Sequence, residues 1–206
     1  MVSISAMREV IMVAKRLDEK NLVNAFEGNV SILRDGYLYI TPSGKNKALL
    51  TEEMIAVFDA EGQQVGGIVP ASSELKMHRA VYEMRDNICG IVHAHPPCLT
   101  AYALCAKSFY SEAHAEMLWD HKCIEVVPYG RPGSDNIYIG VKPILDKGRD
   151  VMLLANHGAL AVGKTVFDAM NKMESVENAA KISILAKLIG EPCALPKEEV
   201  QALLAI

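Results

Sequence analysis

The chain has 206 residues, of which 50% are hydrophobic and 22% are charged, and its formal net charge is −4. This composition is typical of a globular protein, and the weak negative charge argues against a nucleic-acid partner. No apolar run approaches the roughly 20 residues of a membrane span, and residues 1–20 lack the continuous apolar core of a signal peptide. The sequence therefore predicts a cytoplasmic protein with one α/β domain over residues 1–206.

The five cysteines are odd in number and include no Cys-x-x-Cys pair. Most have apolar neighbours in the sequence, which predicts that they are reduced residues of the core. This usage fits a cytosolic protein rather than a disulfide framework.

The first part of the chain predicts a helix and then a hairpin. Apolar residues at helical spacing indicate a helix over residues 7–20. Two β-type runs over residues 28–33 and 37–40 flank the pair Asp35-Gly36. Asp-Gly between two such runs is a strong signal for a tight antiparallel hairpin.

The rest of the chain predicts further strands and helices. Ser72 or Ser73 is expected to cap a helix that carries Glu74 in its first turn, where a carboxylate suits the helix dipole. His78 and His121 are interpreted as structural or exposed. The other expected elements are a short helix after residue 51, strands over 55–58 and 66–69, a helix to about 85, a strand over 90–92, a helix over 99–105, a strand over 124–127, a helix over 143–147, a strand over 151–155 that continues into or pairs with 159–162, and a long helix over 166–189.

Two histidines at a strand end form half of a candidate metal site. His93 and His95 lie two residues apart, and in an extended chain this spacing puts both imidazoles on one face. Pro96 and Pro97 then stop the strand, because neither can donate to a ladder. The pair alone is weak evidence, since strands often contain satisfied or exposed histidines.

A third histidine, His157, strengthens the metal hypothesis. It also follows an apolar strand, and Gly158 leaves room for close approach. Three neutral imidazoles with an open fourth position are the usual arrangement of a catalytic zinc site, whereas a structural site is closed, normally by cysteine. The sequence therefore favours a catalytic metal.

Glu74 is the candidate acid or base. A carboxylate in a first helical turn most often only complements the helix dipole. Here a proline and two serines precede it, so its backbone is well fixed. Near a metal, such a carboxylate can bind the ion while the site is empty and act as a base when substrate arrives.

Three short polar segments with small residues lie at strand or helix ends. Small residues let backbone N–H groups approach a phosphate, and a helix N-terminus favours its negative charge. Each segment is an ordinary turn when taken alone, so only the set is informative. Its members are Gly28, Asn29, Ser43, Gly44, Ser72 and Ser73.

Five motifs, in order and with matching gaps, closely resemble the class II aldolase/adducin family. They are Gly-Asn-Val-Ser at 28–31, Thr-Pro-Ser-Gly at 41–44, Ser-Ser-Glu at 72–74, His-Ala-His at 93–95 and Asn-His-Gly at 156–158. The resemblance covers about residues 5–190. It implies an α/β/α sandwich around a central, mainly antiparallel sheet, and a homotetramer with sites at the subunit interfaces.

The resemblance also implies a metal-dependent sugar-phosphate aldolase with one Zn²⁺ per subunit on His93, His95 and His157. Glu74 would be a further ligand and the acid or base that moves a proton on the dihydroxyacetone phosphate half. The six residues of the polar segments would bind the substrate phosphate. The implied reaction is reversible cleavage of a (deoxy)ketose 1-phosphate, such as L-fuculose 1-phosphate, to dihydroxyacetone phosphate and lactaldehyde through a metal-stabilised enediolate.

The chain departs from the family pattern at two places. In the family's aldolases a tyrosine from the neighbouring subunit serves as the second acid, and a gapless count from His95 places His114 there. Histidine can transfer protons near neutral pH, so His114 is the candidate catalytic residue; Tyr110 or a merely structural rim position are the alternatives. The chain also ends, over residues 201–206, without the tyrosine of the family's C-terminal tail.

The same motifs are also compatible with other functions. A 5-deoxyribulose or methylthioribulose 1-phosphate aldolase or dehydratase would use the same site. The L-ribulose-5-phosphate 4-epimerase branch typically has aspartate in place of Glu74, so the glutamate favours an aldolase. An adducin-like interaction domain would generally lack the metal histidines, and this chain has all three.

Overall fold

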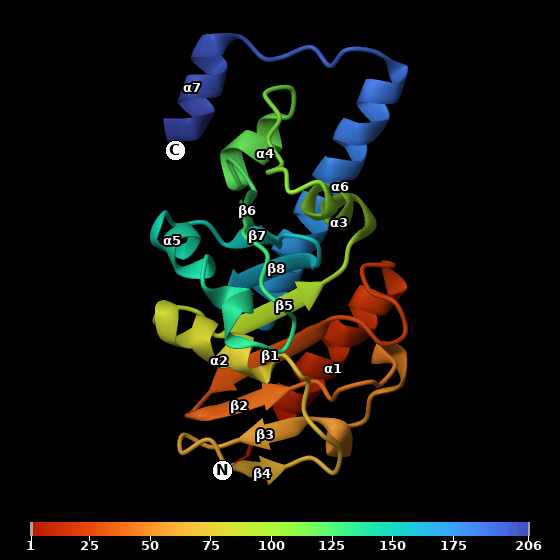
Figure 1. The fold of residues 1–206 in the computed structure, drawn as a ribbon, viewed down its shortest axis with the longest axis vertical. Helices are drawn as coiled ribbons and strands as arrows, with labels where there is room; N and C mark the ends of the chain where they lie inside the picture. The colour runs from red at the N-terminus through yellow and green to blue at the C-terminus, as the bar shows by residue number, and fades with distance from the viewer. Residues whose placement is uncertain (1, 206) are drawn as a thin grey trace.

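The computed structural model describes residues 2–205, and its centre is one eight-stranded sheet (Figure 1). The strands are β1 (Asn29–Arg34), β2 (Tyr37–Ile40), β3 (Ala56–Phe58), β4 (Gln64–Gly66), β5 (Gly90–Ala94), β6 (Glu125–Val127), β7 (Val151–Leu154) and β8 (Gly158–Gly163). Their order across the sheet is β4-β3-β2-β1-β5-β8-β7-β6. Every neighbouring pair is antiparallel except β6 and β7, which are parallel.

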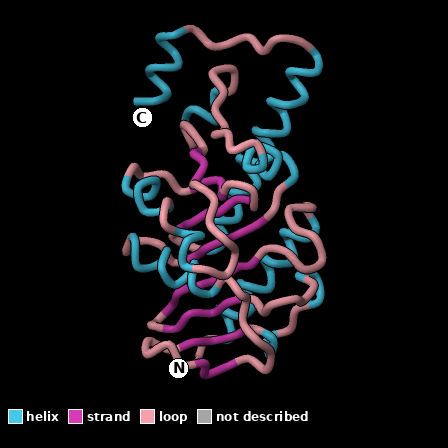
Figure 2. The backbone as a smooth tube through the Cα atoms, viewed as in Figure 1, coloured by secondary structure: helices cyan, strands magenta, loops and turns pink. Residues whose placement is uncertain are grey.

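Helices cover both faces of this sheet (Figure 2). One face packs against α1 (Ile4–Glu19), α3 (Pro97–Leu104) and α6 (Val166–Ile189), and the other against α2 (Leu75–Met84) and α5 (Val141–Asp146). Successive strand residues alternate between the two cores, as in β7, where Leu153 enters the first and Met152 the second. The α/β/α sandwich around a mainly antiparallel sheet is therefore confirmed. No helix in the described part of the chain is long and apolar enough to span a bilayer.

The strongest local patterns predicted their elements well. The long helix spans residues 166–189 as expected, and the first helix begins before residue 7, at Ile4. Its cap is Ser3, whose side chain accepts a hydrogen bond from the backbone N–H of Ala6. Asp35 and Gly36 both have positive φ, 52° and 77°, which suits the tight hairpin between β1 and β2.

Short elements were predicted less well. The strand expected over residues 66–69 lies earlier, as β4, and the expected helix after residue 51 is a single 3-10 turn, η2 (Glu52–Met54). Four elements had no prediction, and three of them are only three to six residues long. They are η1 (Lys47–Leu49), α4 (Ala115–Asp120), η3 (Asp135–Tyr138) and α7 (Lys197–Ala205).

The prediction of core cysteines is wrong. None of the five is buried: three are exposed and two are partly exposed, and all five are free thiols. Apolar neighbours in a sequence do not imply burial, because alternate strand residues and opposite helix faces point in opposite directions.

The central strands bring the predicted site motifs to one end of the sheet. In the pairing of β1 with β5, Asn29 lies opposite His93. In the pairing of β5 with β8, Ala94 lies opposite Ala159, and β8 begins at Gly158, directly after the turn that carries His157. Segments that are far apart in the sequence thus meet where β1, β5 and β8 lie side by side.

The turn into α3 holds the chain just after β5. The backbone N–H of His95 donates to the carbonyl of Leu22 at 2.9 Å. At the start of α3, the buried carboxylate of Glu177 accepts the backbone N–H groups of Cys98 and Leu99, both at 2.9 Å. These contacts satisfy helix donors that would otherwise be unpaired, and they fix the backbone that carries His95.

Candidate metal centre and substrate pocket

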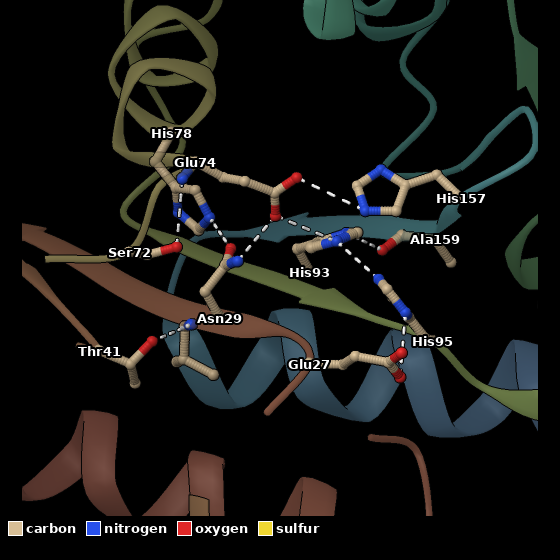
Figure 3. A network of polar contacts seen from close by, with 11 residues as sticks. Glu27, Asn29, Thr41, Ser72, Glu74, His78, His93, His95, His157 and Ala159 are labelled. Carbon is tan, nitrogen blue, oxygen red and sulfur yellow. Dashed lines mark hydrogen bonds and ion pairs between the residues drawn. The ribbon is translucent and has the colours of Figure 1, made fainter. Parts of the chain in front are cut away.

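The structure brings the three histidines together (Figure 3). His93 is the fourth residue of β5 and is fully buried, His95 follows the strand, and His157 lies in the turn between β7 and β8. Their ring centroids are 4.7–5.0 Å apart, and one ligand atom from each lies within 4.8 Å of the others. The three imidazoles can therefore share one metal ion.

Outer hydrogen bonds orient two of these rings. Nδ1 of His93 lies 2.9 Å from the carbonyl oxygen of Ala159, so it donates its proton there. Nδ1 of His95 lies 3.2 Å from Oε2 of Glu27 and donates in the same way. The two Nε2 atoms, 3.1 Å apart, then face each other through lone pairs, an arrangement that suits a shared cation.

Glu74 completes the cluster of donor atoms. Its Oε2 lies 3.2 Å from Nε2 of His93, and its Oε1 lies 3.5 Å from Nε2 of His157. Oε1 is buried and has no hydrogen-bond partner among residues 2–205. Three imidazoles and an unpartnered carboxylate oxygen are the ligand types that zinc takes in catalytic sites, so these residues fit the expected metal.

The predicted position of Glu74 in the first turn of α2 is wrong by one residue. Glu74 is itself the N-cap residue, and no side chain caps the helix. Ser72 Oγ instead accepts the backbone N–H of Glu74 at 3.2 Å. Since the Glu74 carboxylate faces the histidines, complementing the helix dipole is not its main interaction.

The charge states of Glu74 and the three histidines suit a bound cation. Burial alone raises the pKa of the Glu74 carboxyl, but the neighbouring His93 and the hydrogen bond from Asn29 outweigh it and hold this pKa below its usual value. Burial lowers the pKa of His93, and it also lowers the pKa of His95 and of His157. The site thus holds neutral imidazoles beside an ionised carboxylate.

A pocket of about 170 Å³ opens above this cluster. Its wall includes all six residues of the polar segments, together with Glu74, His95 and His157. Gly28 adopts a positive φ of 72°, and a Cβ there would lie 2.5 Å from Val23 Cγ1 and 2.9 Å from the His93 carbonyl oxygen. Only glycine fits at this close approach.

Phe26, Glu27, Pro42 and Pro132 line the rest of the pocket. Of these, Glu27 matters most chemically, because its carboxylate contacts His95. No pattern in the sequence marked Glu27, which looks like an ordinary loop residue before Gly28.

His114 does not reach this pocket within one chain. It is the N-cap residue of α4, beyond β6, and its Nε2 lies 3.5 Å from the Glu116 carboxylate (Figure 1). Neither His114 nor Tyr110 is among the pocket residues. A role for either one at the site therefore requires a neighbouring subunit, and this role stays a prediction.

His78 is more closely tied to the site than the sequence suggested. It is fully buried, and its ring contacts Asn29 and Ser31, which lie on β1 beneath Glu74. His78 lies in α2 four residues after the N-cap residue Glu74, a spacing that puts the two side chains on the same side of the helix start, and this spacing was the available signal.

The burial of His78 predicts a loss of stability in acid. Burial lowers its pKa from 6.5 to about 3, so below pH 6.5 the unfolded chain binds a proton that the folded chain excludes. The free energy of unfolding therefore falls as the pH falls, by about 2 kcal/mol from this residue between pH 7 and pH 5. Urea unfolding of the metal-free protein at both pH values measures it.

The matched variant is His78→Gln, which cannot titrate. The other buried histidines shift stability in the same direction in both proteins, so the difference between the two pH dependences isolates His78. Equal pH dependences for wild type and variant would contradict the prediction.

The comparisons with known proteins agree with this geometry. Residues 8–184 match the family model described as Class II Aldolase and Adducin N-terminal domain. An L-fuculose phosphate aldolase of Methanococcus maripaludis is 33% identical over 178 residues, which cover 86% of this chain and 95% of the relative. A 5-deoxy-D-ribulose 1-phosphate aldolase of Bacillus thuringiensis is 28% identical and covers 95% of this chain and 92% of its own length.

A solved structure is also similar over the whole chain. It is an L-fuculose 1-phosphate aldolase with a TM-score of 0.88 and 34% sequence identity, and the match covers 100% of this chain and 97% of that one.

Proposed function

The chain belongs to the class II aldolase and adducin family and is a metal-dependent sugar-phosphate aldolase, and we propose that its substrate is a (deoxy)ketose 1-phosphate. The products would be dihydroxyacetone phosphate and a small aldehyde. L-fuculose 1-phosphate, which gives lactaldehyde, is the first candidate because the similar relatives carry that name. The similarity to the Bacillus relative favours 5-deoxyribulose 1-phosphate as the second candidate.

The observation that carries this proposal is the position of Glu74 between the histidines and the pocket. The Glu74 carboxylate oxygens lie 3.2 and 3.5 Å from the Nε2 atoms of His93 and His157. Glu74 also lines the pocket that contains the six small and polar residues. A ketose 1-phosphate has a phosphate at one end and reacting oxygens a few bonds away. The pocket offers suitable groups for both ends.

Zinc is the proposed metal, one ion per subunit, held by His93, His95 and His157. When bound, such an ion supplies Lewis-acid stabilisation of the negative charge that develops on substrate oxygens. Glu74 would be a further ligand before substrate arrives.

The chain's own residues then account for the protons. Cleavage breaks the C3–C4 bond, removes the proton of the C4 hydroxyl and adds a proton to C3. Glu74, ionised at rest and close to the pocket, would carry the C3 proton, as a base in the synthetic direction and as an acid in cleavage. The second group would be the partner subunit's His114, with Tyr110 as the alternative.

The phosphate would lie against Gly28, Asn29, Ser43, Gly44, Ser72 and Ser73. Ser73 is exposed and Gly44 has open space around its Cα, so a ligand can approach both. This binding set, a homotetramer with shared sites and a cytoplasmic location remain predictions.

The deciding experiment incubates the zinc-loaded protein with L-fuculose 1-phosphate, 5-deoxyribulose 1-phosphate, methylthioribulose 1-phosphate and L-ribulose 5-phosphate. Coupled reduction of dihydroxyacetone phosphate reports cleavage, and protein without metal is the control. The proposal expects cleavage of at least one 1-phosphate. The proposal would be overturned if no 1-phosphate were cleaved and the protein instead converted L-ribulose 5-phosphate to its epimer or removed water from methylthioribulose 1-phosphate.

Loss of the Glu27 carboxylate is expected to weaken metal binding. In Glu27→Gln the side chain keeps its size but no longer offers His95 Nδ1 a charged acceptor, so His95 becomes a poorer ligand. Loss of such an outer partner typically lowers metal affinity about 10- to 100-fold. Competition with a chromophoric chelator measures the zinc affinity directly.

Glu53→Gln is a suitable control, because Glu53 lies in η2 and does not line the pocket. An unchanged zinc affinity in Glu27→Gln would show that the contact between Glu27 and His95 does not tune the site.

A further inference from the structure

A line of buried polar side chains runs from Tyr82 to Glu74. Tyr82 Oη lies 2.8 Å from Ser31 Oγ, which lies 2.6 Å from Nδ1 of His78. Nε2 of His78 contacts Oδ1 of Asn29, whose Nδ2 donates to Oε2 of Glu74 at 2.8 Å. All five residues are less than 9% exposed. Figure 3 shows the part of this line from His78 to Glu74 and on to the metal histidines.

Two regular elements create this line. Glu74 is the N-cap residue of α2, and His78 and Tyr82 follow it at intervals of four residues on one face of that helix. Asn29 and Ser31 are two residues apart and share one face of β1. The helix stripe and the strand face are packed together, so the side chains alternate between the two elements.

The hydrogen bonds of this line all run in one direction. The ionised Glu74 can only accept, so Asn29 must present its NH₂ group there and its oxygen to His78. Nε2 of His78 must then carry the proton. Since burial keeps His78 neutral, its Nδ1 accepts from the Ser31 hydroxyl, and Ser31 in turn accepts from Tyr82.

We propose that His78 is a positioning residue for Glu74. Its Nε2–H fixes the orientation of the Asn29 amide, and the amide holds Oε2 of Glu74 toward His93. The oxygen and nitrogen ends of an asparagine are nearly equal in size, so packing alone does not choose between them. A reversed amide would place Oδ1 against the carboxylate and replace an attraction with a repulsion.

The role also explains why a histidine is buried here without touching the pocket. His78 is absent from the pocket wall, and its two ring nitrogens are both used within the line. Serine and tyrosine hydroxyls can donate or accept, so they adapt to either tautomer of the ring. The ionised carboxylate of Glu74 sets the direction because it can only accept, and the Nε2–H of His78 holds the Asn29 amide in the matching orientation.

The first test needs no catalytic activity. Nitrogen NMR of the metal-free protein, with histidine labelled at the ring nitrogens, identifies which nitrogen of His78 carries the proton. The proposal expects the proton on Nε2, with Nδ1 as an acceptor. A proton on Nδ1 would overturn it, whatever the enzyme's substrate.

The second test compares variants of the zinc-loaded protein. His78→Leu removes both ring interactions, whereas His78→Gln restores an N–H donor toward Asn29. We expect kcat to fall about 10- to 100-fold in the leucine variant, with a smaller change in KM, and to recover substantially in the glutamine variant. Equal losses in both variants would show that His78 only supports the fold.

Tyr39→Phe is the matched control for loss of a buried hydrogen bond. Tyr39 is fully buried, and its hydroxyl accepts the backbone N–H of Ser3, outside the line to Glu74. Its kcat should stay close to that of wild type. The effect on turnover rests on the proposed aldolase activity: if wild type cleaves none of the sugar phosphates, that activity fails, and the NMR result alone still decides the role of His78.

Discussion

Replacing His93 with alanine is expected to remove the bound metal and abolish turnover. His93 is the most deeply buried of the three histidines, and its imidazole lies within 5.0 Å of the other two ring centroids. The variant would lose one of the three nitrogen ligands, and the Glu74 carboxylate would have to replace it permanently instead of being free to act as a base. Loss of an outer hydrogen-bond partner typically lowers metal affinity about 10- to 100-fold, and loss of a direct ligand should lower the zinc affinity further.

Metal analysis of the purified variant after dialysis decides this prediction. His121→Ala is the control, since His121 follows α4 and contacts Ser175 on the surface. That variant should keep one zinc per chain. Circular dichroism of His93→Ala would exclude global unfolding as the cause. Undiminished zinc in folded His93→Ala would remove His93 from the ligand set.

The histidine cluster was the part of the site best predicted from local spacing. The period of two residues in a strand placed His93 and His95 on one face, and the structure shows their Nε2 atoms 3.1 Å apart. His157 joins them because β8 pairs with β5, a contact between residues more than sixty positions apart. Local periodicity does not specify such pairing, so the prediction of His157 rested on its place after an apolar strand and before Gly158, and then on the family motifs.

The orientation of Glu74 lay beyond what helix-start rules can predict. Those rules favoured a serine cap with a carboxylate in the first turn. The structure instead uses Ser72 Oγ to accept the Glu74 backbone N–H, and Asn29 to hold the carboxylate away from the helix. Asn29 acts from β1, forty-five residues earlier, so the competing interaction is tertiary and invisible to a local pattern.

The end of the chain shows the opposite case, in which a strong pattern stops predicting burial. Apolar residues continue at helical spacing to the end of α6, yet Leu188 and Ile189 are 80% and 90% exposed. Beyond them the chain turns back toward α4, where Lys122 Nζ donates to the carbonyl of Leu204 at 2.8 Å (Figure 1). The hydrophobic periodicity predicted this helix correctly. Only the tertiary structure shows which of its turns pack against another element and which are exposed.

Glu74→Gln is expected to lose most turnover while keeping the metal. Glutamine has nearly the same size as glutamate, but its amide is no base and carries no charge. Removing a positioned acid or base typically costs about 10²- to 10⁴-fold in rate, so kcat should fall within that range. The three histidines remain, so zinc content should not change.

This prediction is tested by measuring kcat and bound zinc in the same preparation of the variant. Loss of turnover with one zinc per chain would assign Glu74 to proton transfer, whereas loss of both would make it chiefly a ligand. Glu83→Gln, on the exposed part of α2, controls for a change of charge on this helix. Wild-type turnover in Glu74→Gln would rule out an acid or base role.

The pKa of Glu74 lies below its usual value, so this carboxylate stays ionised in mild acid. Loss of activity in mild acid should therefore follow release of the metal from the histidines.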